Sequence, residues 1–214
     1  MYQNNPTRVL TGEVRLSYCN LVEPRANMNG GEPKYSVTLL IPKTDTNTLN
    51  DIRQSMAAAY EEGVNKKWGG ARPRGREIIH DGDGVRDNGT PFGEECRGCW
   101  VITASSKRRP SVRGIDNYTV ELAPQDIYSG MYGRVSLTFF AYDTAGAKGV
   151  ACGLDNVLKT REGDPLSGGA SADSDFAEVA AAYQQQAAPA QYQQAAPAPT
   201  VTYQAINPLT GLPM

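Results

Sequence analysis

Alternation of apolar and polar residues along several short segments is the feature that most constrains how this chain folds. In residues 132–143, YGRVSLTFFAYD, apolar side chains from Val135 to Ala141 alternate with a more polar set. A period of two places successive side chains on opposite faces of a strand, so one face of this segment is buried. Similar strand patterns occur in residues 8–22, 34–42, 100–107, 117–122 and 149–159. The sequence therefore predicts a mainly β fold.

One segment has helical spacing instead. Apolar residues between Leu49 and Tyr60 recur every three or four positions within residues 44–63, and Gly63 provides a stop signal. Residues 66–98 are rich in Gly, Arg and Asp and predict long loops. The combination indicates an all-β fold with a helical insertion, and periodicity alone leaves a barrel and a sandwich open.

Charge divides the chain into two parts. The net charge is −2, but residues 1–161 hold all 21 basic residues and 18 of the 23 acidic ones, which leaves this part with a net charge of +3. Residues 162–214 are acidic and then rich in Gln, Ala and Pro. Such a composition buries too little apolar surface to offset its conformational entropy. We therefore expect one folded domain over 1–161 and a disordered tail over 162–214.

Basic residues concentrate in the middle of the folded part. Residues 66–113 hold 11 basic and 6 acidic residues, with aromatic side chains between them. A local excess of positive charge suits a groove that follows phosphates, because binding there releases condensed counterions. Aromatic rings in such a groove provide stacking surfaces for bases. A solvated basic loop is the alternative interpretation.

The two faces of the 132–143 strand differ in what they carry. Tyr35 in the 34–42 strand and Phe139 lie on apolar faces, which predicts core positions, whereas Phe140 and Tyr142 share a face with Arg134. An exposed Trp68 beside Lys66 and Lys67 is a third candidate for stacking, and the alternative is that its ring pins a loop to the barrel. The residues predicted to contact DNA are Lys66, Lys67, Trp68, Arg72, Arg74, Arg76, Trp100, Lys107, Arg108, Arg109, Arg134, Phe140 and Tyr142.

Several segments together resemble a known family. They include GGEPKYSVTLLIPK, KWGG, ASSKRRP, IYSGMYGRVSLTFFAYD and KGVACGLDNVLK, in this order within residues 8–178. They resemble the tailed-phage single-stranded DNA-binding proteins. The resemblance implies a five-stranded OB-fold barrel and a role without catalysis, in which the protein coats single strands during phage DNA replication and recombination. A phage structural or assembly protein that uses the barrel for protein contacts is the competing interpretation.

The tail departs from this family. Members usually end soon after an acidic stretch, whereas here Asp173, Asp175 and Phe176 precede a Gln/Ala/Pro segment that ends in NPLTGLPM. By resemblance the three residues are a docking site for replication or recombination proteins, and the acidic tail can also compete with DNA for the basic groove. A solubilising linker is the alternative.

No motif predicts a metal, a cofactor or catalysis. Cys96 and Cys99 form a single CxxC, a weak zinc signal without a nearby second pair. A zinc deaminase requires H-x-E and a Pro before the CxxC, but Gly82 and Glu95 occupy those positions. The acidic residues between Asp81 and Asp87 lack the spacing of a calcium loop.

The sequence also bears on location. No segment reaches the roughly 18 consecutive apolar residues of a membrane span, and the N-terminus lacks the pattern of a signal peptide. We expect a soluble, cytoplasmic protein, in the bacterial host if a phage encodes it, with its four cysteines reduced.

Overall fold

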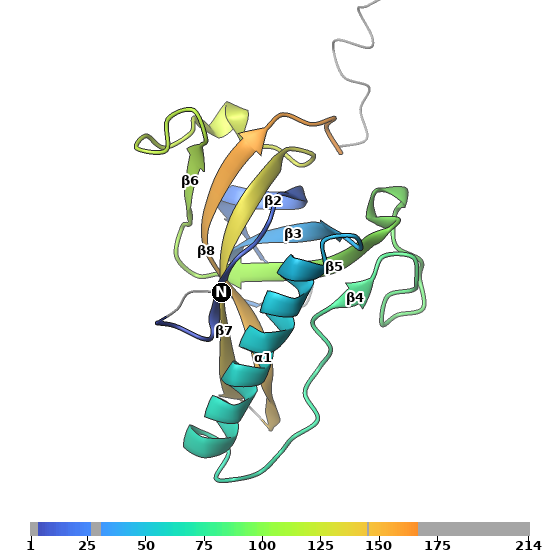
Figure 1. Cartoon of the computed structure of the whole chain (residues 1–214), viewed down its shortest axis with the longest axis vertical. Helices are drawn as coiled ribbons and strands as arrows, with labels where there is room; N and C mark the ends of the chain where they lie inside the picture. Colours follow the sequence, from blue (N-terminus) through green and yellow to red (C-terminus); the bar gives the residue numbers. More distant parts are fainter. Residues whose placement is uncertain (1–3, 27–30, 145, 167–214) are drawn as a thin grey trace, which may run out of the picture. The chain divides into compact units, whose positions relative to one another are not determined.

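The computed structural model describes residues 4–26, 31–144 and 146–166, all within a compact unit formed by Met1–Gly169. Residues Ala170–Met214 form a second unit that lies outside the described residues. Eight strands and one long helix make up the described part (Figure 1). They are β1 (Arg8–Leu10), β2 (Val14–Arg25), β3 (Lys34–Pro42), α1 (Thr46–Lys66), β4 (His80–Asp81), β5 (Cys99–Ser106), β6 (Ser111–Gly114), β7 (Tyr132–Thr144) and β8 (Ala147–Arg161), with short 3-10 helices at Glu94–Cys96 and Pro124–Asp126.

Five strands close into a ring. Antiparallel pairing joins β2 to β3, β3 to β5, β7 to β8 and β7 back to β2. The ring is completed by β5 and β8, which run parallel and meet at one bridge, between Ser105 and Gly153. In chain order, β5 and β8 are the third and fifth strands of this ring. A ring of five strands in which these two are parallel resembles the OB-fold, so the predicted barrel is confirmed. The remaining strands β1, β6 and β4 extend the sheet at β7, β8 and β5.

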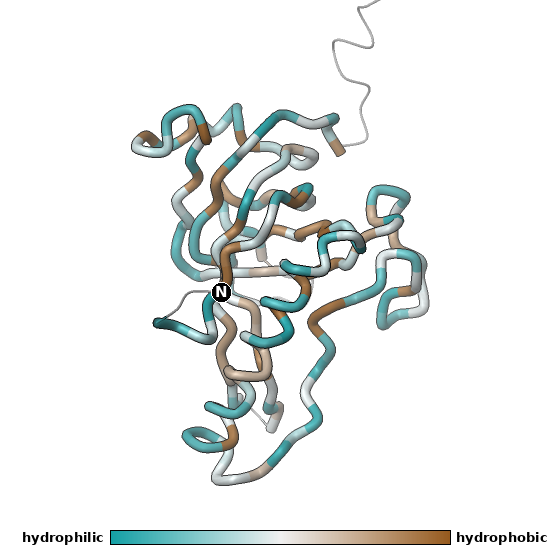
Figure 2. The backbone as a smooth tube through the Cα atoms, in the orientation of Figure 1, coloured by the Kyte–Doolittle hydropathy of each residue, from teal (hydrophilic) through white to brown (hydrophobic). Residues whose placement is uncertain are grey.

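Alternation along the strands builds the core. Val135, Leu137 and Phe139 of β7 and Val37 and Leu39 of β3 are all buried, while their neighbours along each strand point away from this cluster. Hydrophobic and hydrophilic stretches alternate along the barrel backbone (Figure 2). Tyr35, which the same pattern also assigns to the core, is only half-buried because it lies near the start of β3.

Helix α1 covers one side of the barrel. It begins after Asp45, whose carboxylate accepts a hydrogen bond from the Thr48 amide at 3.0 Å. The helix packs on β7 and β8 (Figure 1) and buries Ile52 in the core. It runs three residues beyond the predicted stop at Gly63. That glycine lies under Trp68, and a Cβ there would be 2.6 Å from the indole ring. Gly63 thus permits close packing and does not end the helix.

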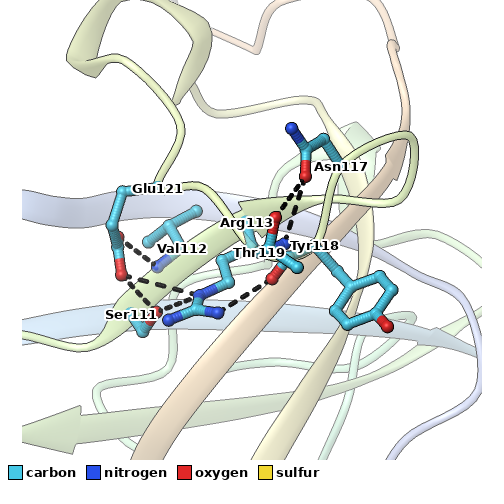
Figure 3. Close-up of polar contacts among 7 residues, drawn as sticks. All are labelled: Ser111, Val112, Arg113, Asn117, Tyr118, Thr119 and Glu121. Atoms are coloured by element: carbon cyan, nitrogen blue, oxygen red, sulfur yellow. Dashed lines mark hydrogen bonds and ion pairs between the residues drawn. The ribbon is translucent and has the colours of Figure 1, made fainter.

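Residues 117–122 do not form the predicted strand. The side-chain oxygen of Asn117 accepts hydrogen bonds from the Thr119 hydroxyl at 2.6 Å and the Thr119 amide at 3.3 Å, which holds this segment in a turn (Figure 3). The strand of this region is β6, at Ser111–Gly114, which pairs parallel with β8. Local turn chemistry therefore overrides the alternating pattern here.

The first residues of the predicted tail contact the barrel. Arg15 donates to the Asp164 carbonyl at 2.8 Å, Tyr128 donates to the Gly163 carbonyl at 2.9 Å, and the Leu166 amide donates to Ser129 at 2.8 Å. These bonds satisfy backbone groups that would otherwise need water. The part of the chain that packs on the barrel therefore extends beyond residue 161.

Among the described residues, no helix is long and apolar enough to cross a membrane.

Candidate nucleic-acid interface

Three adjoining cavities form a groove along the outer surface of β7 and β8. The first, about 580 Å³, lies between the β7–β8 hairpin and the ends of β3 and β5. The second, about 430 Å³, shares Ser106, Thr138 and Asp155 with the first. The third, about 450 Å³, shares Arg8 and Asn156 with the second. We call the three together the groove, since they follow one another without a break in their lining.

The groove is strongly basic. Among the described residues that line it, Asp155 is the only acid, and it is already bound by Arg8 at 3.2 Å and by the Thr138 hydroxyl at 2.6 Å. Such an excess of positive charge attracts a phosphate backbone. The basic lining residues are Lys34, Lys107, Arg8, Arg108, Arg109, Arg113 and Arg134.

Two aromatic rings lie in the first cavity. Phe140 is 47% exposed, and Tyr142 is half-buried beside it on the same face of β7. Both rest on glycines of β8: a Cβ at Gly153 would lie 3.2 Å from the Phe140 ring, and one at Gly149 would lie 2.9 Å from the Tyr142 hydroxyl. The glycines let the rings lie close to the neighbouring strand. This arrangement can offer a flat surface to an unpaired base.

Two basic groups in the groove are held differently: Lys107 has an exposed ion pair, whereas Arg134 is anchored to the backbone. Lys107 pairs with Glu32 at 2.5 Å, and both side chains are more than half exposed. The Lys107 ammonium lowers the pKa of Glu32 by hydrogen bonding to its charged form. Arg134 donates through Nε to the Thr11 carbonyl at 2.9 Å while remaining exposed. Because exposed ion pairs contribute little, a phosphate can replace Glu32 at small cost.

The structure corrects the prediction for Trp68. Its side chain is only 4% exposed, its Nε1 donates to the Tyr142 carbonyl at 3.0 Å, and its ring packs edge-on against Tyr60 at 5.1 Å. The ring fills the space between the end of α1 and β7, with Val64 and Ala141. Trp68 is thus a core residue and offers no face to a base.

The predicted basic residues near the end of α1 also lie outside the groove. Lys66 and Arg72 pair with the helix residues Glu62 and Glu61. Lys67 donates to the Ala141 carbonyl at 2.8 Å. None of these residues, nor the exposed Arg74, lines any of the three cavities.

Arg76 and Trp100 occupy other surroundings. Arg76 bonds to Asp87 at 2.7 Å and lines a separate cavity of about 650 Å³. Trp100 is half-buried against the core, and the cations of Lys43 and Arg53 lie 5.2 and 5.8 Å from its ring centre. Of the predicted DNA contacts, six line the groove: Lys107, Arg108, Arg109, Arg134, Phe140 and Tyr142.

The groove also includes residues that the prediction omitted. Arg8 reaches it because β1 pairs with β7, which places Arg8 opposite Thr138. Lys34 begins β3, while Arg113 and Tyr118 come from the β6 region. Arg113 lies in the basic stretch of the sequence and Tyr118 lies next to it. The local concentration of basic and aromatic residues could therefore have identified both. No local pattern singles out Arg8 or Lys34.

The cysteines and aspartates that suggested a metal have structural surroundings. Within the described ranges, no three Cys, His, Asp or Glu side chains come together to hold an ion. Burial raises the pKa of Cys96 to about 11, so its thiol is protonated near neutral pH. Asp81 and Asp83 bind Lys43 at 2.5 and 2.7 Å, and this contact lowers the pKa of both carboxyl groups.

Comparison with known proteins agrees with this geometry. A family model described as the single-stranded DNA-binding protein of Enterobacter phage Enc34 matches residues 7–187. "Putative protein p50" of Acyrthosiphon pisum secondary endosymbiont phage 1 is 30% identical over 192 residues, which cover 84% of this chain and 97% of the relative.

Solved structures are similar as well. The single-stranded DNA-binding protein of bacteriophage Enc34, in complex with single-stranded DNA, is 27% identical with a TM-score of 0.65, over 78% of this chain and 92% of that one. The single-stranded DNA-binding protein of bacteriophage T7 is 16% identical with a TM-score of 0.51, over 80% of this chain and 93% of that one, and supports the fold alone.

Proposed function

Because the chain belongs to the family of phage single-stranded DNA-binding proteins represented by that of Enterobacter phage Enc34, we propose that it holds single strands in the groove and coats them during phage DNA replication and recombination. The observation that carries the proposal is that basic side chains and two aromatic rings line one continuous surface. The protein would act in the cytoplasm of the infected host.

Binding in the groove combines two kinds of contact. Lys107, Arg108 and Arg109 hold phosphates, and the rings of Phe140 and Tyr142 stack on bases. Neither contact reads base edges, so we expect little sequence preference. The role is binding without catalysis. Docking of replication or recombination proteins on Asp173, Asp175 and Phe176 is also part of the proposal. These residues lie outside the described ranges.

The direct test is a titration with single-stranded and duplex DNA of equal length at two salt concentrations. Salt-sensitive binding that favours single strands supports the proposal, because stacking on Phe140 needs an unpaired base. Absence of binding at low salt, or equal affinity for both DNAs, would overturn it.

Changing Lys107, Arg108 and Arg109 to alanine is expected to flatten the salt dependence of binding. For single strands, each phosphate contact makes the slope of log K against log salt steeper by about 0.7. Loss of three contacts should therefore make the slope shallower by about 2. The measurement is affinity for an oligothymidylate across a salt series.

A triple variant with the same charge change provides the control. Lys66, Arg72 and Arg74 are exposed and lie outside the groove, so replacing them with alanine should leave the slope close to that of the wild type. An equal fall in both variants would mean that general charge, and not the groove, holds the DNA.

A further inference from the structure

The third cavity of the groove differs from the other two in its lining. It lies at the opposite end from Phe140 and Tyr142 and is formed largely by apolar groups, including Leu10, Val157 and Tyr118. Tyr118 is 67% exposed, the most open of the large hydrophobic side chains in the described part of the chain. An exposed aromatic side chain beside a concave apolar surface is a feature of ligand-binding sites.

The backbone that carries Tyr118 is fixed by polar contacts (Figure 3). Arg113 donates from Nη1 to the Tyr118 carbonyl at 2.9 Å and from Nε to the Ser111 hydroxyl at 3.0 Å. Glu121 accepts from the Val112 amide at 3.1 Å and from the Ser111 hydroxyl. The Tyr118 ring points away from this network (Figure 3). The loop therefore presents the ring without using it for its own stability.

Three guanidinium groups line the same cavity, and each has an internal anchor. Arg8 donates to Ser136 at 3.1 Å, Arg134 donates to the Thr11 carbonyl at 2.9 Å, and Arg113 holds the Tyr118 loop. Anchored groups lose less conformational freedom when a ligand binds. An apolar floor and an aromatic ring suit a base, and fixed guanidinium groups suit the phosphates on either side of it.

We propose that the third cavity is a second base-binding station, in which an unpaired base stacks on Tyr118 while Arg113 and Arg134 hold its flanking phosphates. The inference rests on the proposed function and adds to it. The strand is then stacked at both ends of the groove, on Phe140 at one end and on Tyr118 at the other, and is held between them by the basic residues of the second cavity.

The exposed residues Ile115 and Val120 suggest the competing occupant, a protein. They are 50% and 57% exposed and lie in the same loop as Tyr118, but neither lines the cavity. A protein contact would use all three side chains as one apolar patch, whereas a base needs only Tyr118. This difference separates the two occupants.

The test measures affinity of the full chain for oligothymidylates of about 4 to 16 nucleotides, the range of site sizes for OB-folds. Tyr118→Ala is expected to lower affinity for the longest oligonucleotides about fivefold to 150-fold, the loss of one stacked base. Tyr118→Phe, which keeps the ring, should bind like the wild type. With the shortest oligonucleotides, which reach one station, Tyr118→Ala should have little effect unless Phe140→Ala is combined with it.

The outcomes are distinct. Unchanged affinity of Tyr118→Ala at every length overturns the second station while leaving the proposed function in place. An equal loss in the control Ile115→Ala/Val120→Ala also overturns it, because the loop as a whole, and not stacking on Tyr118, would then determine the affinity. Failure of the wild type to bind any length removes the proposed function itself.

Discussion

Replacing Phe140 and Tyr142 together with alanine is expected to lower affinity for single strands by about 2–6 kcal/mol, because each stacked base contributes about 1–3 kcal/mol. This corresponds to a loss of roughly thirtyfold at least. Fluorescence or anisotropy titration with a labelled oligothymidylate measures the effect. The fold should survive, because Phe140 is half exposed and Tyr142 receives the Trp68 hydrogen bond through its backbone carbonyl.

A leucine pair at the same positions is the matched control for this prediction. Leucine keeps apolar bulk over Gly149 and Gly153 but has no aromatic face. Both double variants should therefore lose affinity, and the leucine variant should unfold close to the wild-type midpoint. If either double variant bound single strands as tightly as the wild type, bases would have to stack elsewhere.

Changing Trp68 to alanine is expected to destabilise the domain by about 3–5 kcal/mol, the usual cost of removing a large buried aromatic side chain. The ring is buried against Tyr60 and Val64, and its indole hydrogen bond would also be lost. Denaturant unfolding at one temperature measures the change as a lower midpoint. Trp68→Phe keeps much of the volume and should cost less.

DNA affinity separates this core role from the stacking role that the sequence predicted. Measured where the variant is still folded, affinity of Trp68→Phe should match that of the wild type, because Trp68 lines none of the groove. A weakened affinity with an unchanged unfolding midpoint would reverse the assignment and return Trp68 to the DNA surface.

Sequence patterns predicted most of the barrel because strand alternation is a local property. The 34–42 pattern coincides with β3, and the pattern at 132–143 falls one residue short of β7. The failures arise where tertiary or turn contacts override the pattern. Gly63 was predicted to end the helix, but in the structure it lies inside the helix and Trp68 packs on it. Asn117 holds in a turn a segment whose alternation is typical of a strand.

The site was less predictable because it joins distant parts of the chain. Arg134, Phe140 and Tyr142 could be grouped correctly, since one strand carries them on one face. Lys66 and Arg72 lie outside the groove, because closeness in sequence to other basic residues does not place side chains on the same surface. Arg8 was missed for the converse reason: only the pairing of β1 with β7 brings it to the groove.

The way the ring of strands closes also determines when a newly made chain becomes able to bind DNA. Strand β1 pairs with β7, and β2, which first pairs with β3, needs β7 to close the ring. Val14 pairs with Gly133, and Glu13 bonds to Arg161, 148 positions later. Contacts of such long range form late and slowly during folding. The groove runs along β7 and β8, so a chain whose synthesis stops before β8 lacks it. The ability to hold a single strand therefore waits until β8, near the end of the domain, has been made.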